Sequence, residues 1–162
     1  MGAAHQLPSL CPKTVAETEG KPFPTILINN INGIQSRSQR QKINLLKDLA
    51  EKQNAIAITI TESHLKPAIE NSEVHIENFT IFRSDRQERN KGGVINYLRD
   101  DIALNTKQIL AYSNKFVEIL ALQLESQNTL LVTIYRPPQC PPHKFKDALE
   151  KLEEVITREV IL

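Results

Sequence analysis

The sequence predicts a single α/β domain whose sheets are mixed and largely antiparallel. A strand, a helix and a second strand follow one another between residues 25 and 60, which is the order of a parallel βαβ unit. Four further strand-like runs then come with only polar loops between them, and this succession favours antiparallel pairing. The chain has 162 residues, enough for one domain with a substantial core but too few for two.

The ordered part is expected to begin at Thr25–Ile28, a short apolar run of strand type that turn-forming residues end. We predict a helix over Ser38–Lys52, because Ser38 can cap it and its apolar residues fall on one face. Ala55–Ile60 is apolar and β-rich, which predicts a strand buried on both faces. The later strands are expected at residues 79–82, 94–98, 116–124 and 129–134, with a hairpin tip at 127–128 and an amphipathic helix over 145–156 after two prolines.

Residues 1–24 are expected to form a flexible leader outside the fold, which leaves 25–162 as the domain. The leader holds four prolines among polar residues and lacks the apolar core of a secretory signal. No apolar run approaches the length of a membrane span. Cys11 and Cys140 give neither a disulfide framework nor a metal-ligand spacing, which favours an intracellular compartment, nucleus and cytoplasm alike. The net charge of +1 means that any phosphate-binding surface is local.

Glu62 is the candidate metal ligand. It follows an apolar strand, so its carboxylate is expected at the mouth of that strand, where desolvation is costly unless a cation or hydrogen-bond donors meet it. Mg²⁺ takes oxygen ligands and keeps several of its waters, so one carboxylate can hold it. An ordinary loop carboxylate is the alternative, since glutamates are mostly exposed.

Two amides, Asn30 and Asn32, stand at the end of the preceding strand. In an extended segment their side chains project to the same side, where they could orient a metal-bound water or a phosphate oxygen. A polar turn before Gly33 is the alternative explanation, because asparagine favours turns.

Tyr135 and Arg136 end the last strand and are followed by two prolines. A phenol and a guanidinium suit phosphate contact, because arginine offers a fork of donors to phosphate oxygens. Successive side chains of a strand point in opposite directions, so the two need not reach one site. Packing of the tyrosine at the rim of a sheet is the alternative.

A basic loop precedes the strand at 94–98. Its candidates for contact with a nucleic-acid backbone are Arg86, Arg89 and Lys91, although charged loops of this kind are more often only solvated. Gly92 and Gly93 lack the Lys-Ser/Thr ending of a P-loop and are interpreted as a tight entry into the strand. The histidines form neither a Ser/His/Asp set nor a zinc spacing, and His64 is notable only because it lies near Glu62.

Taken together, these residues resemble the endonuclease/exonuclease/phosphatase superfamily, and most closely the endonuclease domain of non-LTR (LINE-type) retrotransposons. The similarity covers roughly Thr25–Ile156. No single motif is specific, whereas the order and spacing of the motifs are. The matching stretches are residues 28–34, 60–65, 83–86, 92–94 and 134–138.

The resemblance implies a four-layer α/β/β/α sandwich that hydrolyses phosphodiester bonds of DNA. It implies that Glu62 binds Mg²⁺, with Mn²⁺ as an alternative ion, that Asn30 and Asn32 support the metal, and that Tyr135 lies near the scissile phosphate. In such sites water attacks phosphorus while the metal stabilises the developing charge. In retroelements the nick leaves a 3′-hydroxyl that primes reverse transcription, so a reverse transcriptase domain in the parent polypeptide is the implied partner.

The chain departs from the family pattern in ways that affect the expected activity. Asn29 stands where an aromatic residue is usual, and Thr61 where glutamine is common. Neither the Asp-x-Asn nor the Asp-His element of the family occurs in the 162 residues. We therefore expect the chain to match the N-terminal part of the domain and to be inactive or weak by itself, because catalytic groups act as a unit. Two alternatives are a non-catalytic nucleic-acid-binding or interaction module and a phosphatase acting on small phosphorylated substrates.

Overall fold

The computed structural model describes residues 24–34, 39–86 and 91–160. Its strands and helices, in chain order, are β1 (Thr25–Asn30), α1 (Gln39–Lys52), β2 (Ala55–Thr61), the short 3-10 helix η1 (Asn71–Val74), β3 (Phe79–Ser84), β4 (Val94–Arg99), α2 (Asp100–Ala103), β5 (Thr106–Ser113), β6 (Glu118–Leu124), the 3-10 helix η2 (Glu125–Gln127), β7 (Thr129–Tyr135) and α3 (Pro142–Val160).

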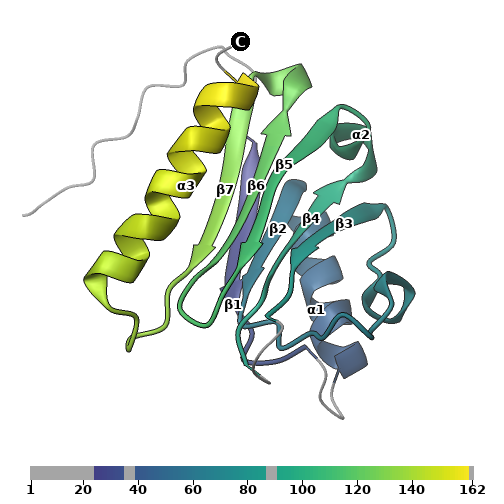
Figure 1. Cartoon of the computed structure of the whole chain (residues 1–162). Coiled ribbons are helices and arrows are strands. Elements are labelled where there is room, and N and C mark those ends of the chain that lie inside the picture. Colours follow the sequence, from purple (N-terminus) through teal and green to yellow (C-terminus); the bar gives the residue numbers. More distant parts are fainter. Residues whose placement is uncertain (1–23, 35–38, 87–90, 161–162) are drawn as a thin grey trace, which may run out of the picture.

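Two sheets lie face to face between two long helices (Figure 1). The first sheet has the strand order β1-β2-β4-β3 and the second has the order β5-β6-β7. Helix α1 packs on the outer face of the first sheet, and α3 packs on the outer face of the second. The predicted α/β/β/α sandwich is therefore confirmed.

The first sheet is mixed and the second is antiparallel. β1 and β2 run parallel on either side of α1 in the sequence, which confirms the predicted βαβ unit, and every other pair is antiparallel. In the parallel pair Asn30 lies opposite Thr61. The carboxyl ends of β1 and β2 thus meet at one edge, and β7 ends at the same end of the molecule (Figure 1).

Apolar side chains fill all three interfaces between the layers. β2 is buried along nearly its whole length, as its composition predicts. Polar contacts also cross between the sheets. Thr133 Oγ1 of β7 donates a hydrogen bond of 2.8 Å to Asn96 Oδ1 of β4, and both residues are buried. A buried hydrogen bond of this kind fixes how the two sheets are aligned, because sliding them would leave both groups unpaired.

Two elements depart from the sequence prediction. Strand β5 and the single-turn helix α2 occupy residues 100–113, where no element was expected. The register of β5 shifts between Gln108 and Leu110, so a bulge interrupts the alternation that would reveal a strand in the sequence. The strand expected from Phe116 begins at Glu118, and the last helix begins at Pro142, where proline is favoured as a first helical residue.

Some predictions fall on residues outside the described ranges. They are the leader up to Phe23, the cap at Ser38 and the candidate nucleic-acid contact Arg89. Within residues 24–34, 39–86 and 91–160, no helix has both the length and the apolar character needed to cross a membrane.

Candidate functional site

Glu62 joins Asn30 and Tyr135 in one hydrogen-bonded group. Asn30 Nδ2 donates to Glu62 Oε1 over 3.1 Å, and the Tyr135 hydroxyl donates to the same oxygen over 2.6 Å. Asn30 is the last residue of β1, Glu62 follows β2, and Tyr135 is the last residue of β7. The structure therefore brings together three side chains that the sequence singled out, and both sheets contribute to the group.

The topology explains this convergence. Asn30 and Glu62 meet because parallel neighbours end at the same edge of a sheet. Tyr135 reaches them because β7 of the second sheet packs opposite β2 of the first. A contact between two sheets depends on how they pack, which no local sequence pattern specifies.

Backbone hydrogen bonds continue the sheet past the strand ends. Gly33 N donates to Glu62 O over 2.7 Å and Ile34 N donates to Ser63 O over 2.9 Å. On the other side, Ser63 N donates to Gly93 O over 3.2 Å and His64 N donates to Gly92 O over 2.8 Å. The backbone of the loop that carries Glu62 is thus held on both flanks by main-chain hydrogen bonds to two other segments.

The loop at Glu62 has a strained backbone. Glu62 and His64 both adopt positive φ, at 55° and 56°. This region is costly for most L-residues, and residues held in it are over-represented at functional sites. The flanking hydrogen bonds of Ser63 and His64 compensate for the strain.

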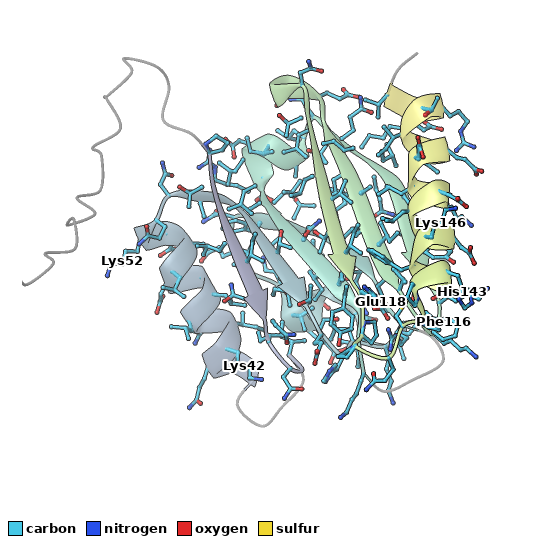
Figure 2. All side chains as sticks on the ribbon, turned by 90° about the vertical axis from the view of Figure 1, so that its left-hand side faces the viewer. Lys42, Lys52, Phe116, Glu118, His143 and Lys146 are labelled. Carbon is cyan, nitrogen blue, oxygen red and sulfur yellow. The ribbon has the colours of Figure 1, made fainter. Side chains whose placement is uncertain are left out.

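Lys42 supports the first loop from below. Its Nζ, reaching up from α1, donates to Ile31 O over 3.0 Å and to Gly33 O over 2.6 Å. Figure 2 shows Lys42 near the end of α1 that lies toward the site. The sequence analysis gave Lys42 no role. A lysine in the first turn of a helix, where the dipole disfavours positive charge, was the available signal.

The hydrogen bonds set the charge state of the group. The donors Tyr135 and then Asn30 hold the pKa of the Glu62 carboxyl below its usual range, because they stabilise the ionised form. Burial, followed by the bond to Glu62, raises the pKa of the Tyr135 phenol to about 12. At neutral pH the pair is therefore a carboxylate and a protonated phenol.

The site fits a hard divalent cation. Oε1 of Glu62 accepts both hydrogen bonds, while Oε2 lies 3.6 Å from His64 Nε2, too far for a hydrogen bond. Oε2 is thus available to a metal, and the side chain is 23% exposed. No cluster of three or more His, Cys, Asp or Glu that could hold a metal occurs among the described residues. A single protein carboxylate suits Mg²⁺, which keeps most of its waters, and not a metal that demands a full protein cage.

A hollow opens in front of Glu62. Its volume is about 340 Å³, within the range of small ligand pockets. Its lining includes two positively charged side chains and two prolines. The lining residues are Glu62, Arg86, Lys91, Gly92, Tyr135, Pro137, Pro138 and Gln139. Its walls therefore combine one anion, a phenol and two cations, which suits a phosphate held next to a metal.

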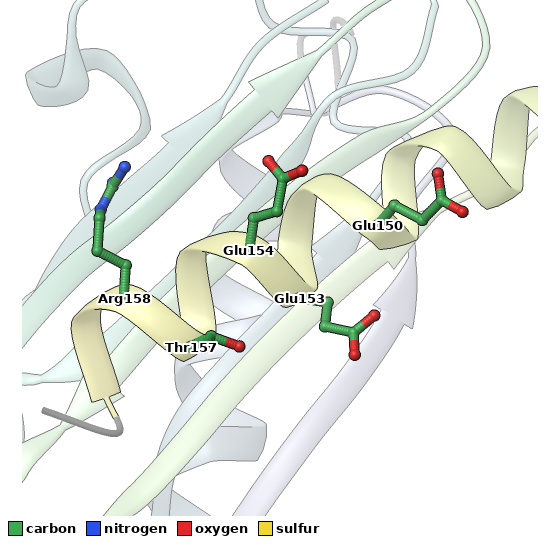
Figure 3. Close-up of a pocket in the computed structure, with 5 residues that line it drawn as sticks. All are labelled: Glu150, Glu153, Glu154, Thr157 and Arg158. Atoms are coloured by element: carbon green, nitrogen blue, oxygen red, sulfur yellow. The ribbon is translucent and has the colours of Figure 1, made fainter.

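A second depression runs along the outside of α3 (Figure 3). Its side chains project from the later turns of the helix and not from the strand ends. They are Glu150, Glu153, Glu154, Thr157 and Arg158. These residues form the polar face of an amphipathic helix, and none of them belongs to the group around Glu62.

Comparison with solved structures decides which fold this is. The AP endonuclease LMAP from Leishmania major aligns with a TM-score of 0.57 and 9% identity, over 82% of this chain and 47% of that one. The endonuclease domain of TRAS1, a telomere-specific non-LTR retrotransposon, aligns with a TM-score of 0.53 and 14% identity, over 80% and 53%. D. rerio TDP2 in complex with a single-strand DNA product aligns with a TM-score of 0.51 and 13% identity, over 83% and 54%.

The chain has the endonuclease/exonuclease/phosphatase fold. It spans about half the length of these solved structures. No protein-family model and no curated protein sequence matches it. At such low identities the comparison establishes the architecture alone.

The remaining candidate residues of this endonuclease/exonuclease/phosphatase fold lie in different places. Asn32 is exposed and left-handed, with φ of 45°, so the extended geometry expected for residues 30–32 is wrong. Its backbone N–H donates to Asn30 Oδ1 over 3.2 Å, so Asn32 orients Asn30 through the main chain. Arg136 donates to Cys140 O over 3.1 Å and stacks 5.0 Å from the ring centre of Phe145 on α3, away from the hollow.

The basic loop is only partly described. Arg89 lies outside the described residues, and Lys91 is exposed at the rim of the hollow. The expectation of a solvated loop is wrong for Arg86, which is 5% exposed and paired with Glu118. Glu118 was not singled out in the sequence. A lone acid inside the apolar run 116–124 was the available signal, because a buried carboxylate needs a partner.

Proposed function

We propose that this chain supplies the metal-binding part of a Mg²⁺-dependent endonuclease site that acts on DNA. The observation that carries the proposal is the convergence of Asn30 and Tyr135 on Oε1 of Glu62, a residue that lines a hollow together with two cations, while Oε2 is not engaged by these two donors. The fold supports it, since its solved examples include an AP endonuclease and a retrotransposon endonuclease domain.

Each residue has a distinct role in this proposal. Glu62 holds Mg²⁺, or Mn²⁺ in its place, through Oε2, and Asn30 keeps the carboxylate in position. The metal, when bound, supplies Lewis-acid stabilisation of charge on the phosphate. Tyr135 stays protonated at neutral pH and donates its single hydroxyl proton to Glu62, so it holds the carboxylate in place at the wall of the hollow that would receive the phosphate. Lys91 places positive charge at the rim, where the nucleic-acid backbone would run.

We expect residues 1–162 alone to nick DNA weakly or not at all. Hydrolysis requires a base that activates water, and among the described residues that line the hollow there is neither a histidine nor an aspartate. The role in retrotransposition, with a reverse transcriptase domain as partner in a longer polypeptide, is part of the same proposal. It is supported by the order of the motifs and by the likeness to the TRAS1 domain.

Metal binding can be tested independently of cleavage. Titration with Mn²⁺ should broaden the NMR signals of residues 30–33, 61–64 and 92–93 selectively, because the paramagnetic ion would sit beside Glu62. Glu62→Gln should abolish the selective broadening, and Glu125→Gln, an exposed glutamate in η2, should leave it intact. Broadening that persists in Glu62→Gln would overturn the proposed metal site.

A plasmid-nicking assay with Mg²⁺ tests the reaction. Any nicking by the wild-type chain should disappear in Glu62→Gln, and strong nicking that survives this change would refute the proposal. DNA binding that is steeply salt-dependent and indifferent to Mg²⁺ would instead indicate a non-catalytic binding module. Phosphate release from inositol phosphates without DNA cleavage would indicate a phosphatase.

A further inference from the structure

A buried ion pair stands behind the wall of the hollow. Arg86 Nε donates to Glu118 Oε1, with the arginine 5% exposed and the glutamate fully buried. Glu118 is the first residue of β6 and lies opposite Tyr135 of β7. Figure 2 shows Glu118 toward the end of its sheet where β7 terminates. The pair therefore connects the second sheet to the loop after β3.

The loop at Gly92 closes over this pair. A Cβ on Gly92 would lie 2.8 Å from Arg86 Nε and 2.8 Å from Glu118 Oε1, and its φ is +97°. Only glycine allows the backbone to approach so closely. The Gly92 carbonyl in turn accepts the hydrogen bond from His64 N, so the ion pair and the Glu62 loop share one support.

The hydrogen bonding of the pair is incomplete. Within the described residues, Arg86 Nη2 and Glu118 Oε2 are buried and have no hydrogen-bond partner. Buried polar atoms are nearly always paired, and a buried ion pair kept for stability alone is often no better than an apolar replacement. The hydrogen bonds of the pair therefore do not by themselves account for a buried guanidinium at this position.

Arg86 faces the Glu62 hollow. It lines this cavity together with Glu62, Lys91 and Tyr135. Its charge acts on the Tyr135 phenol, whose pKa it lowers while Glu118 raises it. The guanidinium thus lies within electrostatic reach of Tyr135, and as a cation that lines the hollow it can attract a phosphate oxygen.

We propose that Arg86 binds a phosphate of the nucleic-acid backbone in the Glu62 hollow and that Glu118 is the residue that positions its guanidinium. This inference rests on the proposed function, since it presumes that the hollow receives a phosphodiester. Glu118 neutralises the arginine in the free protein and fixes its orientation through Nε. The phosphate then meets a donor that is already in place and loses little side-chain entropy on binding.

Salt-dependent DNA binding measures this contact. A labelled DNA duplex is titrated with the protein over a range of salt concentrations, with Ca²⁺ replacing Mg²⁺ to prevent cleavage. Losing one phosphate contact should reduce the slope of log K against log salt by about 0.9. Arg86→Gln should show this reduction and bind roughly tenfold more weakly. Arg99→Gln is the matched control, because Arg99 pairs with Asp101 at the opposite end of the sandwich.

Glu118→Gln separates positioning from charge. It keeps the Arg86 cation but removes the anion that orients it. A DNA in which one phosphate is replaced by a neutral methylphosphonate should bind wild type more weakly. That penalty should shrink in Glu118→Gln and vanish in Arg86→Gln. A purely structural role would lower the unfolding midpoint of both variants and leave the penalty unchanged.

A measurement on the wild-type chain covers the case in which the variants fail to fold. Titration with inorganic phosphate should shift the side-chain Nε–H signal of Arg86 and the amide signals of Gly92 and Gly93. An unchanged Arg86 signal at saturating phosphate, or an unchanged salt slope in folded Arg86→Gln, overturns this inference alone. Absence of DNA binding by the wild-type chain overturns the proposed function and this inference with it.

Discussion

The two ends of the sandwich both contain left-handed backbone. Among the described residues only asparagines adopt it at the end away from the site, whereas at the site end other residue types adopt it besides Asn32. At the end away from the site, the three positions are Asn54, Asn78 and Asn128, with φ of 47°, 66° and 46°, and all three are exposed. At the site end, the positions include Glu62 with φ of 55° and the buried glycines 33, 92 and 93. Asparagine accepts this conformation at little cost, whereas glutamate does not.

The contrast shows at which end the fold contains unfavourable backbone conformations. The far turns need only reverse the chain, and asparagine does so cheaply. At the site the backbone must aim a carboxylate, so Glu62 is held in a costly conformation by hydrogen bonds of Gly33, Ser63 and His64. Backbone strain and close glycine contacts are therefore found around Glu62, whereas the described turns at the opposite end use residues that adopt positive φ at little cost.

Gly92→Ala should produce the largest loss of stability. The new Cβ would meet Arg86 and Glu118 at 2.8 Å with φ at +97°, so we expect the free energy of unfolding to fall by about 2–4 kcal/mol. At the far end, Asn128→Ala meets only the left-handed penalty, about 1 kcal/mol. Urea unfolding of both variants measures the difference. Equal losses at the two positions would remove the distinction between the two ends.

Lys42→Met should have an intermediate effect. It removes two charged hydrogen bonds to the carbonyls of Ile31 and Gly33, so we expect a loss of about 1–2 kcal/mol. Amide hydrogen exchange at Gly33 should also become faster. Lys47→Met on the same helix breaks only surface ion pairs, with Glu77 and Glu51, and should cost less. An unchanged exchange rate at Gly33 would show that the loop needs no support from α1.

Tyr135→Phe should have the smallest effect on stability and a clear effect on titration. The phenol donates to ionised Glu62 and lowers its pKa, so this bond stabilises the fold above the usual pKa of a glutamate and is lost as pH falls through the depressed value. In the variant the Glu62 carboxyl should titrate at higher pH than in wild type. NMR detection of the side-chain carboxyl carbon measures both midpoints, and a midpoint that does not move would show that Asn30 alone sets it.

The sequence predicts much of the framework because its signals are local. The βαβ unit follows from periodicity at residues 25–60, and the meeting of Asn30 with Glu62 follows from parallel pairing. Arrival of Tyr135 at the same carboxylate depends on the packing of two sheets, which only the family resemblance supplied. Strand β5 was not predicted because a bulge interrupts its alternation of side chains. The prediction that Asn30 and Asn32 project to the same side assumed extended backbone, and it is wrong because Asn32 is left-handed.

Burial of charge was the hardest feature to foresee. Arg86 stands among polar neighbours and Glu118 among apolar ones, so composition assigns the first to solvent and gives the second no role. Each is buried only because the other is present, and they are separated by 32 positions in the chain. Which residues pair across such a distance depends on the tertiary fold, and a local sequence pattern does not specify it.

The position of β1 at the margin of its sheet has a consequence for handling the protein. One side of this strand carries unpaired amide and carbonyl groups within the described structure, and Ile28 on it is 75% exposed. An unpaired strand edge of this kind can form backbone hydrogen bonds with an extended segment of another polypeptide. Concentrated preparations should therefore self-associate through β1, and the ladder of the first sheet would continue from one molecule into the next.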